Sequence, residues 1–298
     1  MKVLDLAIVG AGPSGISAAI YAKRSGLDIL LFEKYIVGGQ VVNAFEIENY
    51  PGYSLVNGVD LAFNYQSQLQ SLNIEVAYEE IVKITKEDDI FTLYTNLNNE
   101  YKAKKVILAL GTMPKKLQLE NEEKFTGKGI SFCATCDGNF YKDKEVVIVG
   151  GGNSAFTEAL YLSKIAKKIT ILVRSRILAD KVEVDKVSAL ENVTIIENSI
   201  ISKLYGEDKL TGIDIESLKD GSITHLDCDG VFVYIGQNPP THFLKEFDIL
   251  DEKGYIKVDK DFETSVKGLY SIGDSIPKEV RQIVTAVGDG ASVIHKIK

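Results

Sequence analysis

The chain alternates between short, uninterrupted apolar runs and segments whose apolar residues recur at helical spacing. Residues 4–9 form the first such run, which is apolar except for Asp5, and residues 10–15 read Gly-Ala-Gly-Pro-Ser-Gly. A helical pattern follows. The next predicted strand covers residues 28–32, and Glu33 comes directly after it. Short apolar runs are typical of strands that are buried on both faces. The chain therefore opens with a predicted strand–helix–strand unit.

The same pattern returns in the second half of the chain. Residues 146–155 align on residues 6–15 without a gap, and the match continues until Val173 falls opposite Glu33. Two such units in one chain predict two Rossmann-like domains and two dinucleotide subsites. The expected fold class is α/β, with each domain built as a three-layer ββα arrangement of the FAD/NAD(P)-binding type.

The remaining elements are less strongly patterned. We expect a helix over about residues 58–72 and another over about 281–297. Loops are expected at 38–52 and 236–240, where glycine, proline and polar residues gather. Further strands are expected at residues 74–78, 81–85, 91–95, 105–110, 194–197, 210–215, 230–235 and 269–272.

Composition narrows the class of protein. The 298 residues are 45% hydrophobic and 26% charged, which is typical of a soluble globular chain of about two domains. The formal charge of −8 argues against a nucleic-acid-binding surface. Apolar runs are too short to cross a membrane, and the first strand leaves no room for a signal peptide. With only three cysteines, we expect a cytoplasmic protein without a secreted disulfide framework.

The first glycine loop has the features of a dinucleotide site. Gly10, Gly12 and Gly15 stand between a strand and a helix, and Glu33 follows about 20 residues later. These glycines let the backbone approach a pyrophosphate at the helix N-terminus, and the acid would accept a hydrogen bond from a ribose hydroxyl. A tight strand–helix turn is the alternative reading for the glycines alone.

Cys133 and Cys136 stand two residues apart, with Asp137 directly after them. Such a pair can close a disulfide, or it can supply half of a zinc site. It lies between the two glycine loops, which predicts the redox centre of a flavoprotein disulfide reductase. His225 and Cys228 offer a second pair with metal-like spacing. Residues 223–228 are predicted to be a strand, where residues three apart point to opposite faces, so zinc is disfavoured.

With both glycine loops and the cysteine pair in place, the chain resembles the low-molecular-weight thioredoxin reductases. Residues 133–138, Cys-Ala-Thr-Cys-Asp-Gly, match that family's redox motif. The resemblance implies a discontinuous FAD-binding domain, residues 1–114 and 244–298. Residues 115–243 would form an inserted pyridine-nucleotide-type domain that carries the cysteines and swivels. It also implies a homodimer that reduces thioredoxin.

The resemblance assigns roles to individual residues. Cys136 would lie nearer the flavin, Cys133 would attack thioredoxin, and Asp137 would act as acid and base. A helix-start acid is the alternative for Asp137, and a cap or turn acid for Asp274. The residues expected to bind FAD are Gly10, Gly12, Pro13, Ser14, Gly15, Glu33, Gly39, Gln40, Asn49, Gly111, Gly273, Asp274, Arg281, Gln282 and Ile283.

The electron donor is where the sequence departs from the family. NADPH-dependent members carry a His-Arg-Arg-x-x-x-Arg box, and here the stretch 173–179 reads Val-Arg-Ser-Arg-Ile-Leu-Ala. Arg174 alone occupies one of the arginine positions, whereas Ser175 and Ala179 occupy the others. Losing two charge-assisted hydrogen bonds would weaken NADPH binding by roughly 10²–10⁴, with Arg176 and Lys181 partly compensating. Val173 cannot serve a ribose hydroxyl as Glu33 does.

NADPH is therefore doubtful as a cofactor, and reduced ferredoxin is the expected donor and partner, as in some relatives of this family. Lys164, Lys167 and Lys168 are candidates for a basic contact patch, although a solvated helix end also explains them. Should a nucleotide bind, Gly150, Gly152, Ala155 and Arg174 are the candidate residues. Ala155 and the glycines also suit close helix–strand packing.

Two other functions compete with a ferredoxin-dependent thioredoxin reductase. An NADPH-dependent thioredoxin reductase is the first. A flavin oxidoreductase of the same fold that acts on another acceptor, as ferredoxin–NADP reductases do, is the second, but that class lacks the cysteine pair. A non-catalytic flavin module is disfavoured because both cysteines, Asp137 and the FAD loops are present.

Overall fold

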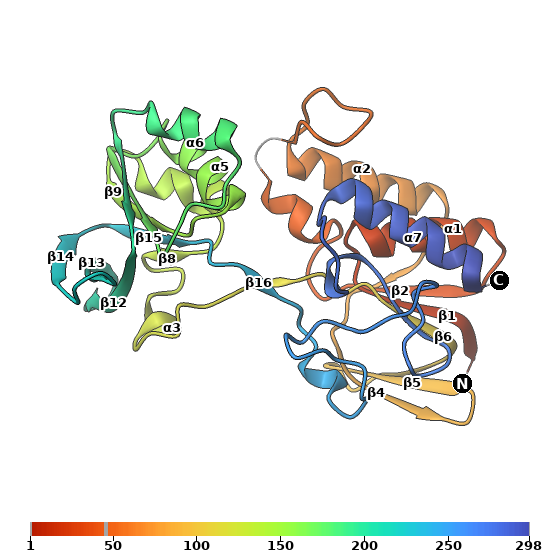
Figure 1. Ribbon diagram of the computed structural model, residues 1–298. Coiled ribbons are helices and arrows are strands. Elements are labelled where there is room, and N and C mark those ends of the chain that lie inside the picture. The colour runs from red at the N-terminus through yellow and green to blue at the C-terminus, as the bar shows by residue number, and fades with distance from the viewer. Residues whose placement is uncertain (1, 45–46, 298) are drawn as a thin grey trace. The chain divides into compact units, whose positions relative to one another are not determined.

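The computed structural model describes residues 2–44 and 47–297. The chain forms two compact units, Met1–Met113 with Asn238–Lys298, and Pro114–Gln237 (Figure 1). It leaves the first unit at β7 (Met113–Pro114) and returns at β16 (Gln237–Asn238). Phe45 and Glu46, which fall in the expected loop 38–52, lie outside the described residues. Among the helices of the described residues, none is both long and apolar enough to span a bilayer.

The first unit is built on one mixed sheet. Its strands follow the order β3-β2-β1-β6-β5-β4, and β17 pairs with β6. The pairs joining β1, β2, β3, β6 and β17 are parallel, whereas β4 and β5 form an antiparallel extension of β6. The bounds are β1 (Val3–Val9), β2 (Ile29–Phe32), β3 (Val76–Ala77), β4 (Ile81–Glu87), β5 (Ile90–Thr95), β6 (Glu100–Leu108) and β17 (Leu269–Ser271).

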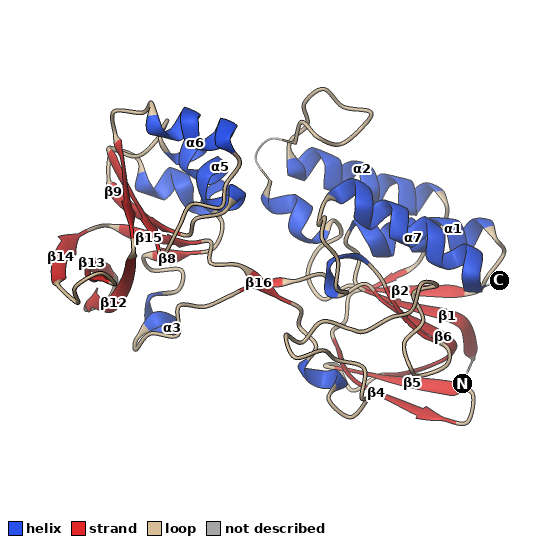
Figure 2. Ribbon diagram, in the orientation of Figure 1, coloured by secondary structure: helices blue, strands red, loops and turns tan. Residues whose placement is uncertain are grey.

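Helices cover one face of this sheet, as Figure 2 shows in blue. They are α1 (Pro13–Arg24), α2 (Gly58–Ser71) and α7 (Ile283–Ile297). Successive residues of β1 point to opposite faces, so Leu6 and Ile8 pack beneath the helices, while Ala7 and Val9 join the core on the β4–β5 side. The uninterrupted apolar run predicted from the sequence is therefore buried on both faces.

The second unit repeats the plan. Its parallel sheet has the order β11-β10-β9-β15-β8, and a separate antiparallel sheet has the order β12-β13-β14. The strands are β8 (Ile130–Ser131), β9 (Glu145–Val149), β10 (Lys168–Val173), β11 (Val193–Glu197), β12 (Ser199–Gly206), β13 (Leu210–Ser217), β14 (Ile223–Asp227) and β15 (Gly230–Val233). The helices are α3 (Glu122–Phe125), α4 (Ala134–Asp137), α5 (Asn153–Leu162) and α6 (Lys181–Ser188).

The internal repeat predicted from the sequence is confirmed in the strand register. Leu6 pairs with Ile29 in the first unit, and Val146 pairs with Ile169 in the second. Val146 and Ile148 pack against the α5 side of the sheet, as Leu6 and Ile8 pack beneath α1. The two α/β units are therefore the same ββα layer arrangement, with the second inserted into the first.

Some features differ from expectation. The second unit ends at Gln237 rather than at residue 243, because the Thr241 hydroxyl donates to the Gly254 carbonyl at 2.8 Å and Phe243 packs against the core of the first unit. Helix α6 was not predicted because its residues are largely charged, and only Val187 is buried. Strand β6 begins at Glu100, earlier than expected, because its polar first half pairs with β5 at the outer part of the sheet.

Candidate dinucleotide and disulfide sites

The glycines of the first loop have different structural roles. Gly10 has φ +105°, and a Cβ added there would lie 2.3 Å from the Ala109 carbonyl oxygen. A Cβ on Gly15 would lie 1.8 Å from the carbonyl oxygen of Gly10. A Cβ on Gly12 would meet nothing within 4 Å. Gly10 and Gly15 are thus needed for packing, whereas Gly12 leaves open space at the N-terminus of α1, where a pyrophosphate would bind.

Glu33 ties the end of β2 to the glycine loop. Its Oε2 accepts a hydrogen bond from the Ala11 N–H at 2.8 Å, and its Oε1 accepts one from the Tyr35 N–H at 2.9 Å. Each carboxylate oxygen keeps a lone pair for a ribose hydroxyl. The Gly38 N–H donates to the Ala11 carbonyl at 2.8 Å, which brings the predicted loop at Gly38 and Gly39 against the fingerprint.

The residues expected along the flavin side come together from distant parts of the chain. Gln40 Nε2 donates to the Thr112 carbonyl at 3.2 Å, beside Gly111. Asn49 Nδ2 donates to Gln282 Oε1 at 3.1 Å, across 233 positions of sequence. Ile283 is the first residue of α7, two positions after the predicted start of this helix. Pro13 and Ser14 open α1.

Asp274 carries the observation that best fits a bound group. Its Oδ1 is buried and has no hydrogen-bond partner within the described residues, and burial raises the pKa of the carboxyl. A buried acceptor without a donor is costly, so a hydroxyl-bearing ligand would satisfy it. Gly273, with φ +75°, lies so close to Ser14 that an added Cβ would be 2.5 Å from Ser14 Oγ. The turn that carries Asp274 is therefore packed against the start of α1, and the set fits a dinucleotide.

Arg281 contacts two groups of the protein itself. Its guanidinium carbon lies 4.7 Å from the centre of the Tyr255 ring, and Nη2 donates to the Ile276 carbonyl at 3.4 Å. The side chain thus stacks on the protein and holds the segment that leads into α7.

In the second unit, Cys133 and Cys136 are joined by a disulfide. Cys133 caps α4, and its Sγ accepts from the Cys136 N–H at 3.2 Å and lies 3.3 Å from Thr135 Oγ1. Asp137 is the last residue of α4 and is partly buried. The phenol oxygen of Tyr234 accepts from the Ala134 N–H at 2.8 Å, a contact for which the sequence carries no motif.

The second glycine loop resembles the first in packing. A Cβ on Gly150 would lie 2.3 Å from the Tyr234 carbonyl oxygen and 3.2 Å from the Ala155 Cβ, so these small residues serve helix–strand packing. Gly152, like Gly12, faces open space. The segment after β10 returns to this loop, since the Leu178 N–H donates to the Gly151 carbonyl at 2.7 Å. The side chain of Arg174, which precedes that segment, is exposed.

The zinc alternative finds no support in the structure. His225 lies on β14, with Nδ1 at 2.9 Å from Asp214 Oδ1 and Nε2 at 3.4 Å from Asp227 Oδ1. Cys228 is buried in the hydrophobic core, in the same cluster as Ile213 and Ile215 of β13, as predicted for a core cysteine. Within residues 2–44 and 47–297, no cluster of three or more His, Cys, Asp or Glu side chains could hold a metal ion.

His225 makes folding stability depend on pH. The hydrogen bond to Asp214 raises the pKa of the imidazole above its ordinary value, despite partial desolvation. A raised folded pKa stabilises the native state fully below the unfolded pKa of about 6.5, and this contribution is lost as pH rises through the folded pKa. We expect His225→Gln to lower the melting temperature near pH 5.5 but not near pH 9. An equal loss at both pH values in a thermal-melt series would exclude the ionic contribution.

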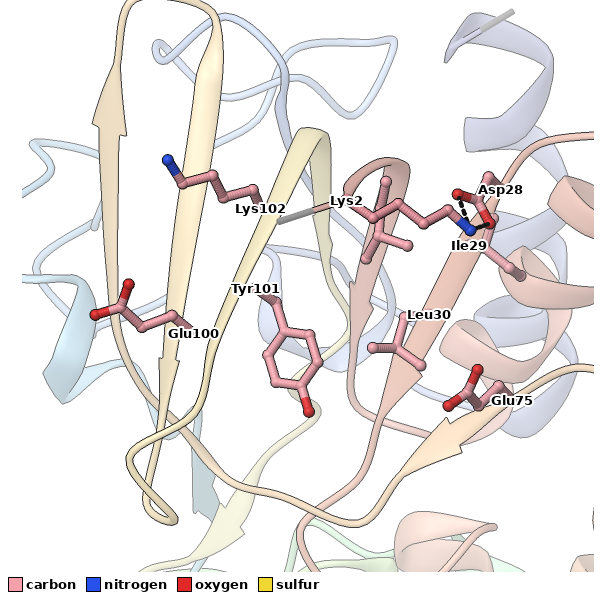
Figure 3. Close-up of a pocket in the computed structure, with 9 residues that line it drawn as sticks. Lys2, Asp28, Ile29, Leu30, Glu75, Glu100, Tyr101 and Lys102 are labelled. Atoms are coloured by element: carbon pink, nitrogen blue, oxygen red, sulfur yellow. Dashed lines mark hydrogen bonds and ion pairs between the residues drawn. The ribbon is translucent and has the colours of Figure 1, made fainter.

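A pocket in the first unit lies away from these sites (Figure 3). Among its lining residues are Lys2, Asp28, Glu75 and Lys102, and the Lys2 ammonium pairs with Asp28 at 2.8 Å. Two of these residues, Lys2 and Asp28, directly precede β1 and β2, and Lys102 lies near the start of β6, where it pairs with Val3. The glycine loop instead follows the end of β1. Ligands of open parallel sheets bind at the carboxyl ends of the strands, so this pocket is not the dinucleotide site.

Comparison with known proteins agrees with this geometry. Residues 4–290 match the family described as pyridine nucleotide-disulphide oxidoreductase. A thioredoxin reductase of Listeria monocytogenes is 40% identical over 291 residues, covering 97% of this chain and 91% of its own. The crystal structure of Lactococcus lactis thioredoxin reductase matches with a TM-score of 0.95 and 35% identity, covering 99% of this chain and 97% of that one.

A ferredoxin-flavin thioredoxin reductase from Clostridium acetobutylicum is more distant. It is 29% identical with a TM-score of 0.53, covering 99% of this chain and 96% of that one. Because the family match spans nearly the whole chain and the Listeria relative is aligned over almost its full length, the chain belongs to the pyridine nucleotide-disulphide oxidoreductase family and, within it, to the low-molecular-weight thioredoxin reductases.

Proposed function

We propose that the chain is an FAD-dependent thioredoxin-disulfide reductase. The observation that carries this proposal is the disulfide between Cys133 and Cys136, which lies in a dinucleotide-type domain, just before the strand β9 that leads into its glycine loop. The relatives at 40% and 35% identity are named thioredoxin reductases, and both align with nearly the whole chain. Thioredoxin is therefore the proposed substrate.

FAD would be held by the first unit. Gly12 and the N-terminus of α1 would receive the pyrophosphate, Glu33 the ribose of the adenosine half, and Asp274 a hydroxyl of the ribityl chain. The buried, unpartnered Oδ1 of Asp274 and the open space at Gly12 support this assignment. Gly39, Gln40 and Asn49 would line the flavin side. When bound, FAD would supply the electron pair that reduces the Cys133–Cys136 disulfide.

The two cysteines would then divide the reduction of thioredoxin. The Cys133 thiolate attacks one sulfur of the thioredoxin disulfide, which forms a mixed disulfide and releases the other thioredoxin sulfur as a thiolate. The Cys136 thiolate next attacks Cys133, which restores the intramolecular disulfide and releases the second thioredoxin sulfur. Asp137 would give a proton to a departing thiolate and take one from Cys136.

The structure provides a reason for making Cys133 the attacking thiol. Its sulfur accepts a hydrogen bond from the Cys136 N–H, and the Thr135 hydroxyl lies within 3.3 Å of it. Donors directed at a sulfur favour its ionised form, and the thiolate is the nucleophile.

The donor prediction rests on the arginine positions alone. The comparisons do not support a ferredoxin-dependent branch, because the ferredoxin-flavin relative is more distant than the other relatives compared. Among the candidate basic residues, Lys167 pairs with Glu145 at 3.3 Å, which weakens the case for a cationic patch. Ser175 and Ala179, which stand at two of the arginine positions, therefore support only weak binding of NADPH at the second glycine loop.

A donor experiment tests this proposal together with the activity. Weak binding at the second loop predicts that stopped-flow mixing with NADPH reduces the flavin slowly. Fast reduction by reduced ferredoxin, with thioredoxin thiols appearing afterwards, would support a ferredoxin donor. Ser175→Arg combined with Ala179→Arg should tighten NADPH binding by up to roughly 10²–10⁴, because two charge-assisted hydrogen bonds are restored.

Other outcomes of this experiment are equally informative. Fast, saturable reduction of the wild-type flavin by micromolar NADPH would make NADPH the donor. If no reductant of either kind produced thioredoxin thiols, the proposed activity would be wrong, and a flavin oxidoreductase with another acceptor would take its place.

The assembly and location of the protein remain predictions. Exposed apolar side chains on and before α2, at Leu55, Val59 and Phe63, accord with a homodimer interface on the first unit. The cytoplasmic location is a prediction from the composition and the small number of cysteines.

A further inference from the structure

An ion pair that the sequence analysis did not identify holds the turn next to Asp274. Lys278 Nζ lies 2.6 Å from Asp289 Oδ2, and the same oxygen accepts the Gly273 N–H at 3.0 Å. Asp289 belongs to α7, whereas Gly273 ends the connection from β17. One carboxylate oxygen therefore joins the helix, the turn and the segment between them.

The surroundings make this pair stronger than a surface ion pair. The side chains of Lys278 and Asp289 are only 14% and 16% exposed, so solvent and salt screen them little. Removing one member of such a pair leaves the other charge uncompensated and poorly solvated. Both contacts to Asp289 Oδ2 are charge-assisted, which makes them stronger than neutral hydrogen bonds.

The turn held by this pair is the one that presents Asp274. Gly273 adopts a left-handed φ of +75° and packs against Ser14, so a small displacement would move both the Asp274 carboxyl and the start of α1. Lys278 and Arg281 also oppose the rise in the Asp274 pKa that burial causes, whereas Asp289 adds to it. Lys278 thus balances the charge of Asp289 beside the unpartnered oxygen.

We infer that Lys278 and Asp289 are positioning residues that hold the Gly273–Asp274 turn in the conformation that binds the ribityl and pyrophosphate part of FAD. The inference rests on the proposed FAD site and extends it to residues that do not themselves contact the dinucleotide. It predicts that FAD affinity depends on the ion pair even though the cysteine chemistry lies in the other unit.

The test measures FAD binding to apoprotein by quenching of flavin fluorescence. Lys278→Met should raise the FAD Kd by ~30-fold or more, as expected when one member of a buried, hydrogen-bonded charge pair is removed. Lys278→Arg, which retains the cation, should stay within about threefold of wild type. The matched control is Lys104→Met, which breaks the more exposed pair with Asp5 in the same unit and should leave the Kd within about twofold.

A second readout does not depend on FAD. Hydrogen exchange of the Gly273 amide in the apoprotein should accelerate in Lys278→Met and in Asp289→Ala, but not in Lys104→Met. An FAD Kd for Lys278→Met within threefold of wild type, or unchanged exchange at Gly273, would overturn the inference. Failure of the wild-type protein to bind FAD would refute the proposed function instead, and the exchange data would still decide whether the pair holds the turn.

Discussion

Replacing either Cys133 or Cys136 with serine should abolish thioredoxin reduction while FAD remains bound. The Ser hydroxyl cannot form the disulfide that accepts the electron pair, so turnover should fall by at least ~10³-fold. The residues proposed to bind FAD lie in the other compact unit, so flavin absorbance per chain should be unchanged. The measurement is the appearance of thioredoxin thiols under a donor that reduces the wild-type protein.

The two variants should differ in what they trap. Cys136→Ser keeps the Cys133 thiol and should accumulate a mixed disulfide with thioredoxin, which a non-reducing gel detects, whereas Cys133→Ser should not. Reductive titration should take four electrons per wild-type chain, about two in FAD and two in the disulfide, and two in either variant. Cys228→Ser is the matched control, because that cysteine is buried and lies outside the disulfide. Full turnover in either variant of the pair would contradict the proposed mechanism.

Gly15→Ala should disrupt the first unit, whereas Gly12→Ala should fold and lose FAD. The added Cβ at Gly15 would lie 1.8 Å from the Gly10 carbonyl oxygen, a backbone atom that cannot move without displacing the loop. We expect a loss of ~3 kcal/mol or more in the free energy of unfolding, the upper range for overpacking. At Gly12 the same methyl enters empty space, so the melting temperature of the apoprotein should change little.

FAD binding separates the two glycines. The Gly12 methyl would occupy space needed by the pyrophosphate, so the FAD Kd should rise about 10-fold or more, which is about 1.4 kcal/mol of binding free energy. Gly152→Ala is the matched control, since it also faces open space but lies in the second unit. A wild-type FAD Kd in Gly12→Ala would place the pyrophosphate elsewhere, and a stable Gly15→Ala protein would show that the loop can relax.

Much of the fold could be predicted from the sequence, because the patterns that predict its strands and helices lie within short segments. A fully apolar run predicts a strand covered on both faces, and Leu6–Val9 is such a run in β1. The gapless alignment of the two halves predicted two Rossmann-like units, and the structure shows the same strand register in both, with Leu6 paired with Ile29 and Val146 with Ile169. Helix α6 and the first half of β6 carried weaker signals because their residues are polar and only one side is covered.

The sequence by itself therefore determined the two α/β units, the glycine loops and the paired cysteines, since each is specified by neighbours within a few positions. Only the tertiary structure showed that Tyr234 accepts a hydrogen bond from the cysteine helix and that Asn49 contacts Gln282. Only the tertiary structure likewise showed that Asp289 bonds both to Lys278 and to the Gly273 amide beside Asp274. These contacts join residues that lie many positions apart and belong to no repeating sequence pattern. These residues meet because whole helices and strands pack together, and the spacing of residues within a short segment does not predict that packing.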